Sequence, residues 1–207
     1  MHVLPLILTT VVAFVTINDV MKRHLKNEEE VVVVEVEVEE AEAVEEVEGV
    51  VAVEGVELPL EANFGGPHGD GFSDETMVKS GQKVLSINLR ASERVDAVIL
   101  TVVSPSGEEA TLFHGGGGGD LKEPLALTDG EYITSMEAHS GKHEGHTRIK
   151  YIKFTTNKEK FIEGGTRTDN NGTETAREGY QLSGFVGRSG DELDMVGAIW
   201  TSIQPVV

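Results

Sequence analysis

The feature that most constrains this chain is a series of short apolar runs with strand periodicity, separated by glycine-rich turns, that begins near Asn63. Residues 95–103 (VDAVILTVV), for example, are β-branched and apolar and end at a turn-forming SPSG tetrapeptide. Of the 24 glycines, 22 lie after residue 62, and no amphipathic helix pattern is found there. Short strands with such turns predict an all-β domain, which is a sandwich, a barrel or a prism. The candidate strands are residues 83–89, 95–103, 110–114, 131–138, 147–155, 181–186 and 195–203.

The charged residues are unevenly distributed along the sequence. The formal net charge is −19, and fourteen of the acidic residues are glutamates within residues 28–61, which contain no lysine or arginine. Residues 62–207 carry 14 basic and 21 acidic residues, so this part is only mildly acidic. Nucleic-acid binding is excluded as the main function, because it requires clustered Lys and Arg. The absence of cysteine excludes a disulfide framework, thiolate catalysis and cysteine-ligated zinc.

The N-terminus carries an almost unbroken apolar run over residues 3–17 (VLPLILTTVVAFVTI). This run is too short to span a bilayer comfortably and fits the apolar region of a secretory signal peptide. We therefore predict a signal peptide over residues 1–19, a secreted protein and no stable membrane span. An uncleaved signal anchor and a buried strand are the alternatives. In a secreted chain, Asn171 would begin an N-glycosylation sequon, Asn-Gly-Thr.

Residues 20–61 form an acidic, low-complexity segment rich in Val and Glu. The Val/Glu alternation of residues 34–40 has strand periodicity, but glutamates repeated along one face repel one another. Low complexity and a single sign of charge favour a solvated, poorly ordered linker. The alternatives are an acidic interaction arm and an added edge strand.

A short string inside this segment resembles a motif of secreted pathogen effectors. Residues 23–26 (RHLK), followed by the glutamates of residues 28–30, are similar to a degenerate Arg-x-Leu-Arg motif with acidic residues behind it. Lys26 stands where the motif has its last arginine. The position shortly after a signal-like segment agrees with this resemblance.

Four strings in the domain that follows resemble jacalin-related lectins. The first is FGGPHGDGFSD at residues 64–74, which is similar to a Trp-Gly-Gly-x-Gly-Gly-x-x-Phe-Asp-Asp opening. The others are residues 114–119 with 130–133, residues 149–157 (IKYIKFTTN) and residues 184–194 (GFVGRSGDELD). The resemblance covers about residues 63–203 and defines a lectin domain over residues 62–207. It implies a β-prism I fold, with three four-stranded antiparallel sheets around a pseudo-threefold axis, preceded by the poorly ordered acidic segment.

The same resemblance implies a carbohydrate site made of two glycine loops. By it, Asp194 accepts hydrogen bonds from two adjacent sugar hydroxyls, because a carboxylate offers two charged acceptors. The backbone amides of Glu192 and Leu193 donate to the ring-side oxygens of the sugar. The alternative for Asp194 is a turn carboxylate that caps a hairpin. The implied site residues are Gly69 in the first loop and Gly190, Asp191, Glu192, Leu193 and Asp194 in the second.

Further histidines and a lysine are candidates for specificity. His68 replaces a glycine of the family pattern in the first loop, and residues 139–147 (HSGKHEGHT) are expected to form a third loop that sets ligand preference. Its candidate residues are His139, Lys142 and His143. The H-x3-H-x2-H spacing is compatible with a metal, but histidines among loop glycines are usually solvated. We predict no metal and no cofactor.

The resulting hypothesis is a secreted, non-enzymatic lectin. Galactose-preferring members of the family depend on a free N-terminal glycine in the first loop, whereas this loop lies in continuous chain, so mannose- or glucose-type glycans are the expected ligands. No Gly-x-Ser-x-Gly nucleophile elbow marks an enzyme. Expected partners are glycans or glycoproteins and, since single-site sugar affinity is weak, further copies of the chain. The alternative is a secreted protein-interaction or effector-like module that uses the prism as a scaffold.

Overall fold

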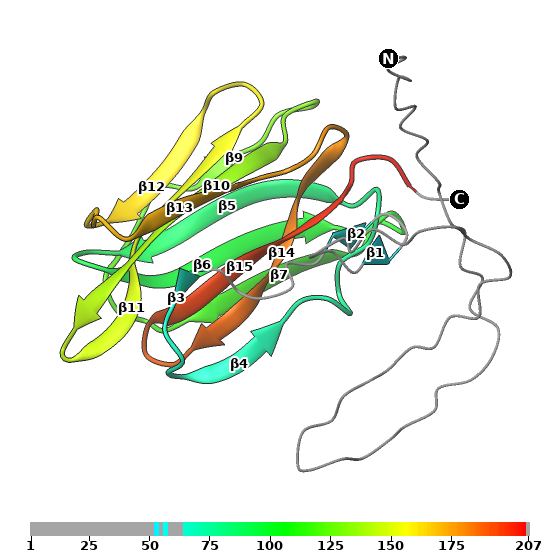
Figure 1. The fold of residues 1–207 in the computed structure, drawn as a ribbon. Helices are drawn as coiled ribbons and strands as arrows, with labels where there is room; N and C mark the ends of the chain where they lie inside the picture. Colours follow the sequence, from blue (N-terminus) through cyan, green and yellow to red (C-terminus); the bar gives the residue numbers. More distant parts are fainter. Residues whose placement is uncertain (1–51, 54–55, 58–63, 206–207) are drawn as a thin grey trace, which may run out of the picture. The chain divides into compact units, whose positions relative to one another are not determined.

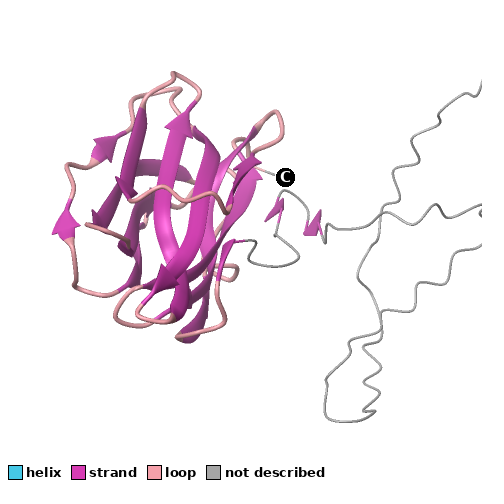
Figure 2. Ribbon diagram, turned by 60° about the vertical axis from the view of Figure 1, so that its left-hand side comes forward, coloured by secondary structure: helices cyan, strands magenta, loops and turns pink. Residues whose placement is uncertain are grey.

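A computed structural model of the chain describes residues 52–53, 56–57 and 64–205. The expected signal peptide, the effector-like string and most of the acidic linker lie outside these residues. Over the described ranges the chain forms fifteen strands and no helix (Figure 2), as the glycine-punctuated apolar runs predict. No helix in these ranges is therefore long and apolar enough to cross a membrane.

The strands vary in length from dipeptides to eleven residues, and the long ones build the interior. Their bounds are β1 (Ala52–Val53), β2 (Val56–Glu57), β3 (Phe64–Gly65), β4 (Asp70–Ser73), β5 (Lys83–Ala91), β6 (Val95–Val103), β7 (Glu109–Gly115), β8 (Asp120–Leu121), β9 (Leu125–Ala126), β10 (Ile133–His143), β11 (His146–Thr156), β12 (Phe161–Gly165), β13 (Asn171–Thr175), β14 (Tyr180–Ser189) and β15 (Leu193–Ser202). Figure 1 labels all of them except β8.

These strands form three antiparallel sheets, which confirms the expected architecture. The first has the order β1-β2-β15-β14-β4, the second β12-β11-β10-β13 and the third β7-β6-β5-β8. In the first sheet β2 and β3 pair with opposite ends of β15, and in the third β8 and β9 pair with different parts of β5. Each sheet thus has four strand positions, with an edge position divided in two in the first and third. Strand β1 adds a further position outside β2.

A repeated backbone contact marks the pseudo-threefold relation between the sheets. Three glycines at intervals of 50 residues have positive φ angles, and a Cβ built on any of them would lie 2.1 Å from a backbone carbonyl oxygen of a neighbouring strand. The amide of the following residue donates to the same carbonyl at 2.7 to 2.9 Å. A larger residue would collide with the sheet, so glycine is required. The three glycine–carbonyl pairs are Gly65 with Asp194, Gly115 with Asp96 and Gly165 with Lys150.

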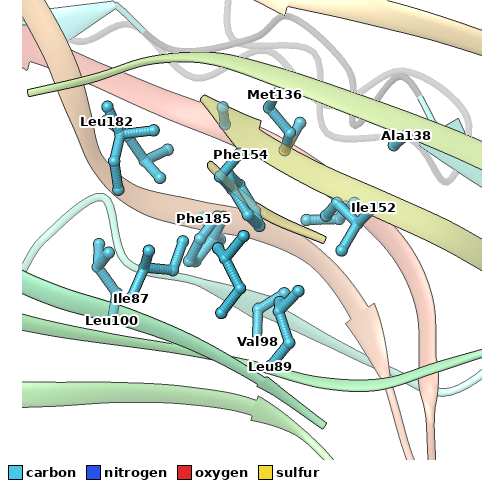
Figure 3. Packing of buried hydrophobic residues seen from close by; sticks show 14 of the residues in the cluster. Ile87, Leu89, Val98, Leu100, Met136, Ala138, Ile152, Phe154, Leu182 and Phe185 are labelled. Atoms are coloured by element: carbon cyan, nitrogen blue, oxygen red, sulfur yellow. The ribbon is translucent and has the colours of Figure 1, made fainter. Parts of the chain in front are cut away.

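One hydrophobic core fills the space between the sheets (Figure 3). Each long hairpin contributes alternate residues to it, because successive strand side chains point to opposite faces. Phe154 on β11 and Phe185 on β14 are fully buried, and their rings meet edge to face with centroids 5.7 Å apart. Leu89 on β5 and Val98 on β6 close the core from the third sheet.

Two strand pieces lie inside the segment predicted to be a poorly ordered linker. Val56 and Glu57 of β2 pair with Thr201 and Trp200 of β15, so the alternative of an added edge strand holds for this part. The reason is local composition. Residues 50–56 (VVAVEGV) contain a single glutamate, so the like-charge repulsion that opposes pairing elsewhere in the segment is absent here.

The glycine contacts predict a graded loss of stability. Gly107 also has a positive φ, but a Cβ there would meet nothing within 4 Å. We expect Gly107→Ala to lower the free energy of unfolding by about 1 kcal/mol, from backbone strain alone. Gly165→Ala should cost about 3 kcal/mol, because the sheet must also move away from the new methyl group. Urea unfolding measures both, and equal losses would contradict a tight glycine–carbonyl contact.

Candidate functional site

Three loops and three hairpin tips meet at one end of the prism. Each loop follows one of the three glycines that contact a carbonyl, and the tips join β5 to β6, β10 to β11 and β14 to β15. The loops rest directly on the tips. A Cβ on Gly66 would lie 2.7 Å from the carbonyl oxygen of Thr147, and one on Gly116 would lie 2.2 Å from that of Asp191. This end of the molecule is therefore closely packed through backbone atoms.

The two glycine loops identified in the sequence come together here. Asp194 is the second residue of β15, and its side chain is 3% exposed. Gly69 faces it so closely that a Cβ there would lie 2.4 Å from Asp194 Oδ2. The amide of Gly190 donates to the carbonyl of Glu192 at 3.0 Å, which closes the turn before Asp194. Leu193 is fully buried, so its side chain belongs to the core, whereas Asp191 is exposed.

An arginine that sequence reasoning missed holds the first loop in place. Arg188 on β14 donates from Nε to the carbonyl of His68 at 3.1 Å and from Nη2 to that of Gly69 at 2.7 Å. Guanidinium donors suit such paired acceptors because their geometry is fixed. The clamp fixes the backbone of the loop without using the carboxylate of Asp194.

The third sheet carries a counterpart of this arrangement. Asp96 is buried at the start of β6, and neither of its carboxylate oxygens accepts a hydrogen bond from a described residue. A Cβ on Gly118 or Gly119 would lie 2.5 or 2.3 Å from these oxygens. Arg90 donates to the carbonyls of both glycines, at 2.8 and 3.1 Å. Arg90 precedes Asp96 by the same interval as Arg188 precedes Asp194, and this repeated spacing is the sequence signal that leads to both arginines.

The second sheet departs from that pattern. Lys150 takes the place that Asp96 and Asp194 have in the other two sheets. His139 takes the place of Arg90 and Arg188. His139 is buried, accepts from the amide of Thr168 at 3.0 Å and donates from Nε2 to Glu137 at 2.8 Å. The structure therefore does not bring His139 to Asp194.

The prediction of a third loop over residues 139–147 is wrong in its secondary structure. Strands β10 and β11 continue to His143 and His146, which pair with each other across a two-residue turn. Glu144 and Gly145 form this turn with φ angles of 48° and 85°, the left-handed pair that a tight hairpin requires. Glycine and histidine resemble loop composition in sequence, but here the strand pairing continues through them.

His143 and His146 lie at the tip of this hairpin, and His68 of the first loop reaches it. The ring of His68 lies 4.4 Å from that of His146, between centroids, and His143 Nε2 accepts from Arg94 Nη1 at 2.7 Å. Lys142 is exposed beside them. Over the described ranges, no group of three or more His, Asp or Glu side chains is placed to hold a metal ion.

An ion triad joins the three hairpin tips. Arg94, Arg148 and Glu192 occupy equivalent positions in the three hairpins. Each lies two residues before the residue that faces a glycine loop, which is Asp96, Lys150 or Asp194 respectively. One carboxylate oxygen of Glu192 contacts Nε of Arg148, and the other contacts Nε of Arg94. Both arginines also reach the neighbouring carboxylates. Arg148 Nη1 contacts Asp194 Oδ1, and Arg94 Nη2 lies 3.2 Å from Asp96 Oδ1.

Burial and charge act in opposite directions on these carboxyl groups. Burial raises the pKa of Asp194 and of Asp96, and the nearby Arg148 and Arg94 counteract part of that rise. Burial also acts to raise the pKa of Glu192, but the hydrogen bond from Arg148 and the charges of both arginines outweigh it, so that this pKa lies below its usual range. Glu192 is therefore held as an anion between two cations.

The arrangement around Asp194 is suited to binding a polar neutral ligand. A nearly buried carboxylate supplies strong acceptors, and the glycine loop packs against one of its oxygens with no side chain in between.

Known proteins share this architecture. Residues 62–199 match the family model described as Jacalin-like lectin domain. "Secreted RxLR effector protein 19" of Plasmopara viticola is 38% identical over 144 residues, which are 66% of this chain and 77% of that protein. The structure of wild-type Malaysian banana lectin is similar with a TM-score of 0.60 and 28% identity, over 74% of this chain and 99% of that one. A mannose-specific jacalin-related lectin from Morus nigra in complex with mannose has a TM-score of 0.59 and 21% identity, over 77% and 99%.

The ion triad predicts a pH-dependent contribution to stability. Glu192→Gln should lower the free energy of unfolding by about 3 kcal/mol at pH 7, because it leaves two poorly solvated arginines without their shared anion. Since the pKa of Glu192 is lowered on folding, the difference from wild type should be complete above about pH 4.3 and shrink as the pH falls further.

Urea unfolding between pH 3 and pH 7 measures this difference. Asp129→Asn serves as the control, since Asp129 forms an exposed ion pair with Lys83 at 2.8 Å. Such surface pairs contribute little. A Glu192→Gln difference that stays constant down to pH 3 would show that the carboxylate charge does not stabilise the tips.

Proposed function

The chain belongs to the family of jacalin-like lectin domains, and from this we propose that residues 62–207 bind mannose- or glucose-type glycans at Asp194. In this proposal the Asp194 carboxylate accepts from two adjacent hydroxyls of a hexose. The amides of Glu192, Leu193 and Gly69 donate to oxygens of the same sugar. The single observation that carries the proposal is the close approach of Gly69 to Asp194, which brings the two glycine loops to one place.

The preference for mannose-type sugars is supported by the chain itself and by its relatives. Gly69 lies in continuous chain, as expected for members that do not depend on a free N-terminal glycine. The Morus nigra lectin of the same fold is described as mannose-specific. His68 and His146, whose rings are in contact beside the first loop, are candidates for tuning this preference, in place of the buried His139.

The expected place of action is outside the cell. The relative from Plasmopara viticola is named as a secreted protein, which agrees with the signal peptide proposed for residues 1–19. Asn171 is exposed at the start of β13, as an N-glycan at this sequon would require. Assembly into homo-oligomers would raise the effective affinity of a weak single site.

A second candidate function is that of a secreted effector. It is favoured by the 38% identity to an effector protein and by the RHLK string of residues 23–26. In this case the prism serves as a scaffold for contact with a host protein, and glycan binding is lost or secondary. The two candidates differ in whether Asp194 is needed for the interaction.

A glycan array with wild type and Asp194→Asn distinguishes them. Wild type should bind mannose-containing glycans, and Asp194→Asn should lose at least about tenfold in affinity, because an amide replaces charged acceptors with one neutral acceptor and a donor. Asp169→Asn is the matched control. Asp169 is an exposed aspartate in the loop after Gly165, where Lys150 takes the place of the carboxylate, so this variant should bind as wild type does. A wild-type protein without any glycan signal would favour the effector function.

A further inference from the structure

The carboxylate of Asp194 is held in surroundings that oppose its charge. Its side chain is 3% exposed, so water solvates it poorly. The charged groups that face it come from every neighbouring element. They are Arg148 on β11, His68 in the loop between β3 and β4, Arg188 on β14 and Glu192 in its own hairpin. Of these, Glu192 is a second anion and therefore makes the negative charge harder to keep.

Among these groups, Arg148 is the cation that contacts the carboxylate directly. Its Nη1 reaches Asp194 Oδ1. Arg188 points its donors at the carbonyls of His68 and Gly69 instead, so it orders the loop and acts on Asp194 only from a distance. The ring of His68 lies against that of His146, with 4.4 Å between their centroids.

Arg148 is itself fixed in position. Its Nε contacts Glu192, and its Nη1 also lies 3.3 Å from the carbonyl oxygen of Thr147. Thr147 in turn packs against Gly66 of the first loop. The guanidinium is therefore tied both to the hairpin that carries Asp194 and to the loop that faces it, and its side chain is only 12% exposed.

A sugar needs the ionised form of this carboxylate. An ionised carboxylate accepts at both oxygens, whereas a protonated one has a donor at one of them and is a weaker acceptor at the other. Two adjacent hydroxyls of a hexose therefore bind the ionised form more strongly, because both of its oxygens are charged acceptors. Burial works against that form, and the positive charge of Arg148 is the main opposing influence on the pKa of Asp194.

We propose that Arg148 is a positioning residue for glycan binding, which keeps the Asp194 carboxylate ionised through a direct ion-pair contact while Glu192 holds the guanidinium in place. This inference rests on the proposed function at Asp194 and names the residue that sets the pH range of that site. Arg148 acts through Asp194, and contact with the sugar is not required of it.

The expected consequence is a change in the pH profile of binding. Without Arg148, burial and Glu192 act unopposed by a contacting cation, so the pKa of Asp194 rises. Binding is then lost at a higher pH than in wild type. A contacting opposite charge typically shifts a carboxyl pKa by about one to three units. The acid midpoint, which is the pH at which half of the binding affinity is lost on acidification, should therefore move up by at least about one pH unit.

The experiment uses the full chain and three variants. Arg148→Met removes the charge and keeps most of the side-chain volume, and Arg148→Lys restores a charge. Arg94→Met is the matched control, because Arg94 is the equivalent arginine of the same triad and contacts Asp96 instead of Asp194. Binding of methyl α-mannoside is measured by calorimetry between pH 4 and pH 8. The carboxyl 13C shift of Asp194 is followed over the same range, and circular dichroism checks folding.

The proposal expects an acid midpoint at least about one pH unit higher in Arg148→Met, and midpoints near that of wild type in Arg148→Lys and Arg94→Met. It is overturned if the midpoint of Arg148→Met stays within half a unit of wild type, or if Arg94→Met moves it equally. Should Arg148→Met fail to fold, Arg148→Gln is measured under the same criteria. If wild type binds no mannoside at any pH, the proposed function fails, and the 13C titration of Asp194 still decides whether Arg148 sets its charge.

Discussion

One carboxylate between two guanidinium groups organises the end of the prism that carries the candidate site. Glu192, Arg94 and Arg148 come from equivalent positions of three hairpins, so the triad lies where the three sheets converge. Each arginine continues to a buried aspartate, Asp96 or Asp194. Charges in such surroundings are costly unless each finds a partner, so the position of one hairpin depends on the positions of the other two. The ion pairs that hold the three hairpin tips together thus also surround the candidate sugar site at Asp194.

The threefold relation is close in the backbone and broken in the side chains. The glycine–carbonyl contact occurs at Gly65, Gly115 and Gly165 with nearly the same geometry. The residue that faces each loop is an aspartate in two cases and Lys150 in the third. The triad likewise contains two arginines and one glutamate, because three like charges at one point would repel. The side chains at equivalent positions therefore differ in charge, which gives the three loops different chemistry and also lets the three hairpin tips pack together.

Most of the fold follows from the sequence, and only part of the site does. Periodicity and turns place long strands such as β6 and β14 correctly, because their side-chain alternation is strong, while the number and arrangement of the sheets come from the family resemblance. Gly69 and Asp194 are found together as the motifs imply. Arg148 was missed because its partners lie 44 and 46 residues away and no local pattern pairs them. Only the end of the hairpin of β10 and β11, within residues 139–147, was mistaken for a loop, since glycine has low strand propensity and the pairing that overrides it is tertiary.

The order of the strands has a consequence for how the protein is made. Strands β3 and β4 leave the ribosome first among those around Asp194, yet their partners are β15 and β14, the last two strands of the described residues. Gly65 pairs with Met195, across more than half of the sequence. Contacts so distant along the chain form slowly and late in folding. The candidate site around Asp194 can therefore assemble only after β14 and β15 have been synthesised, and binding there would report that the two ends of the domain have paired.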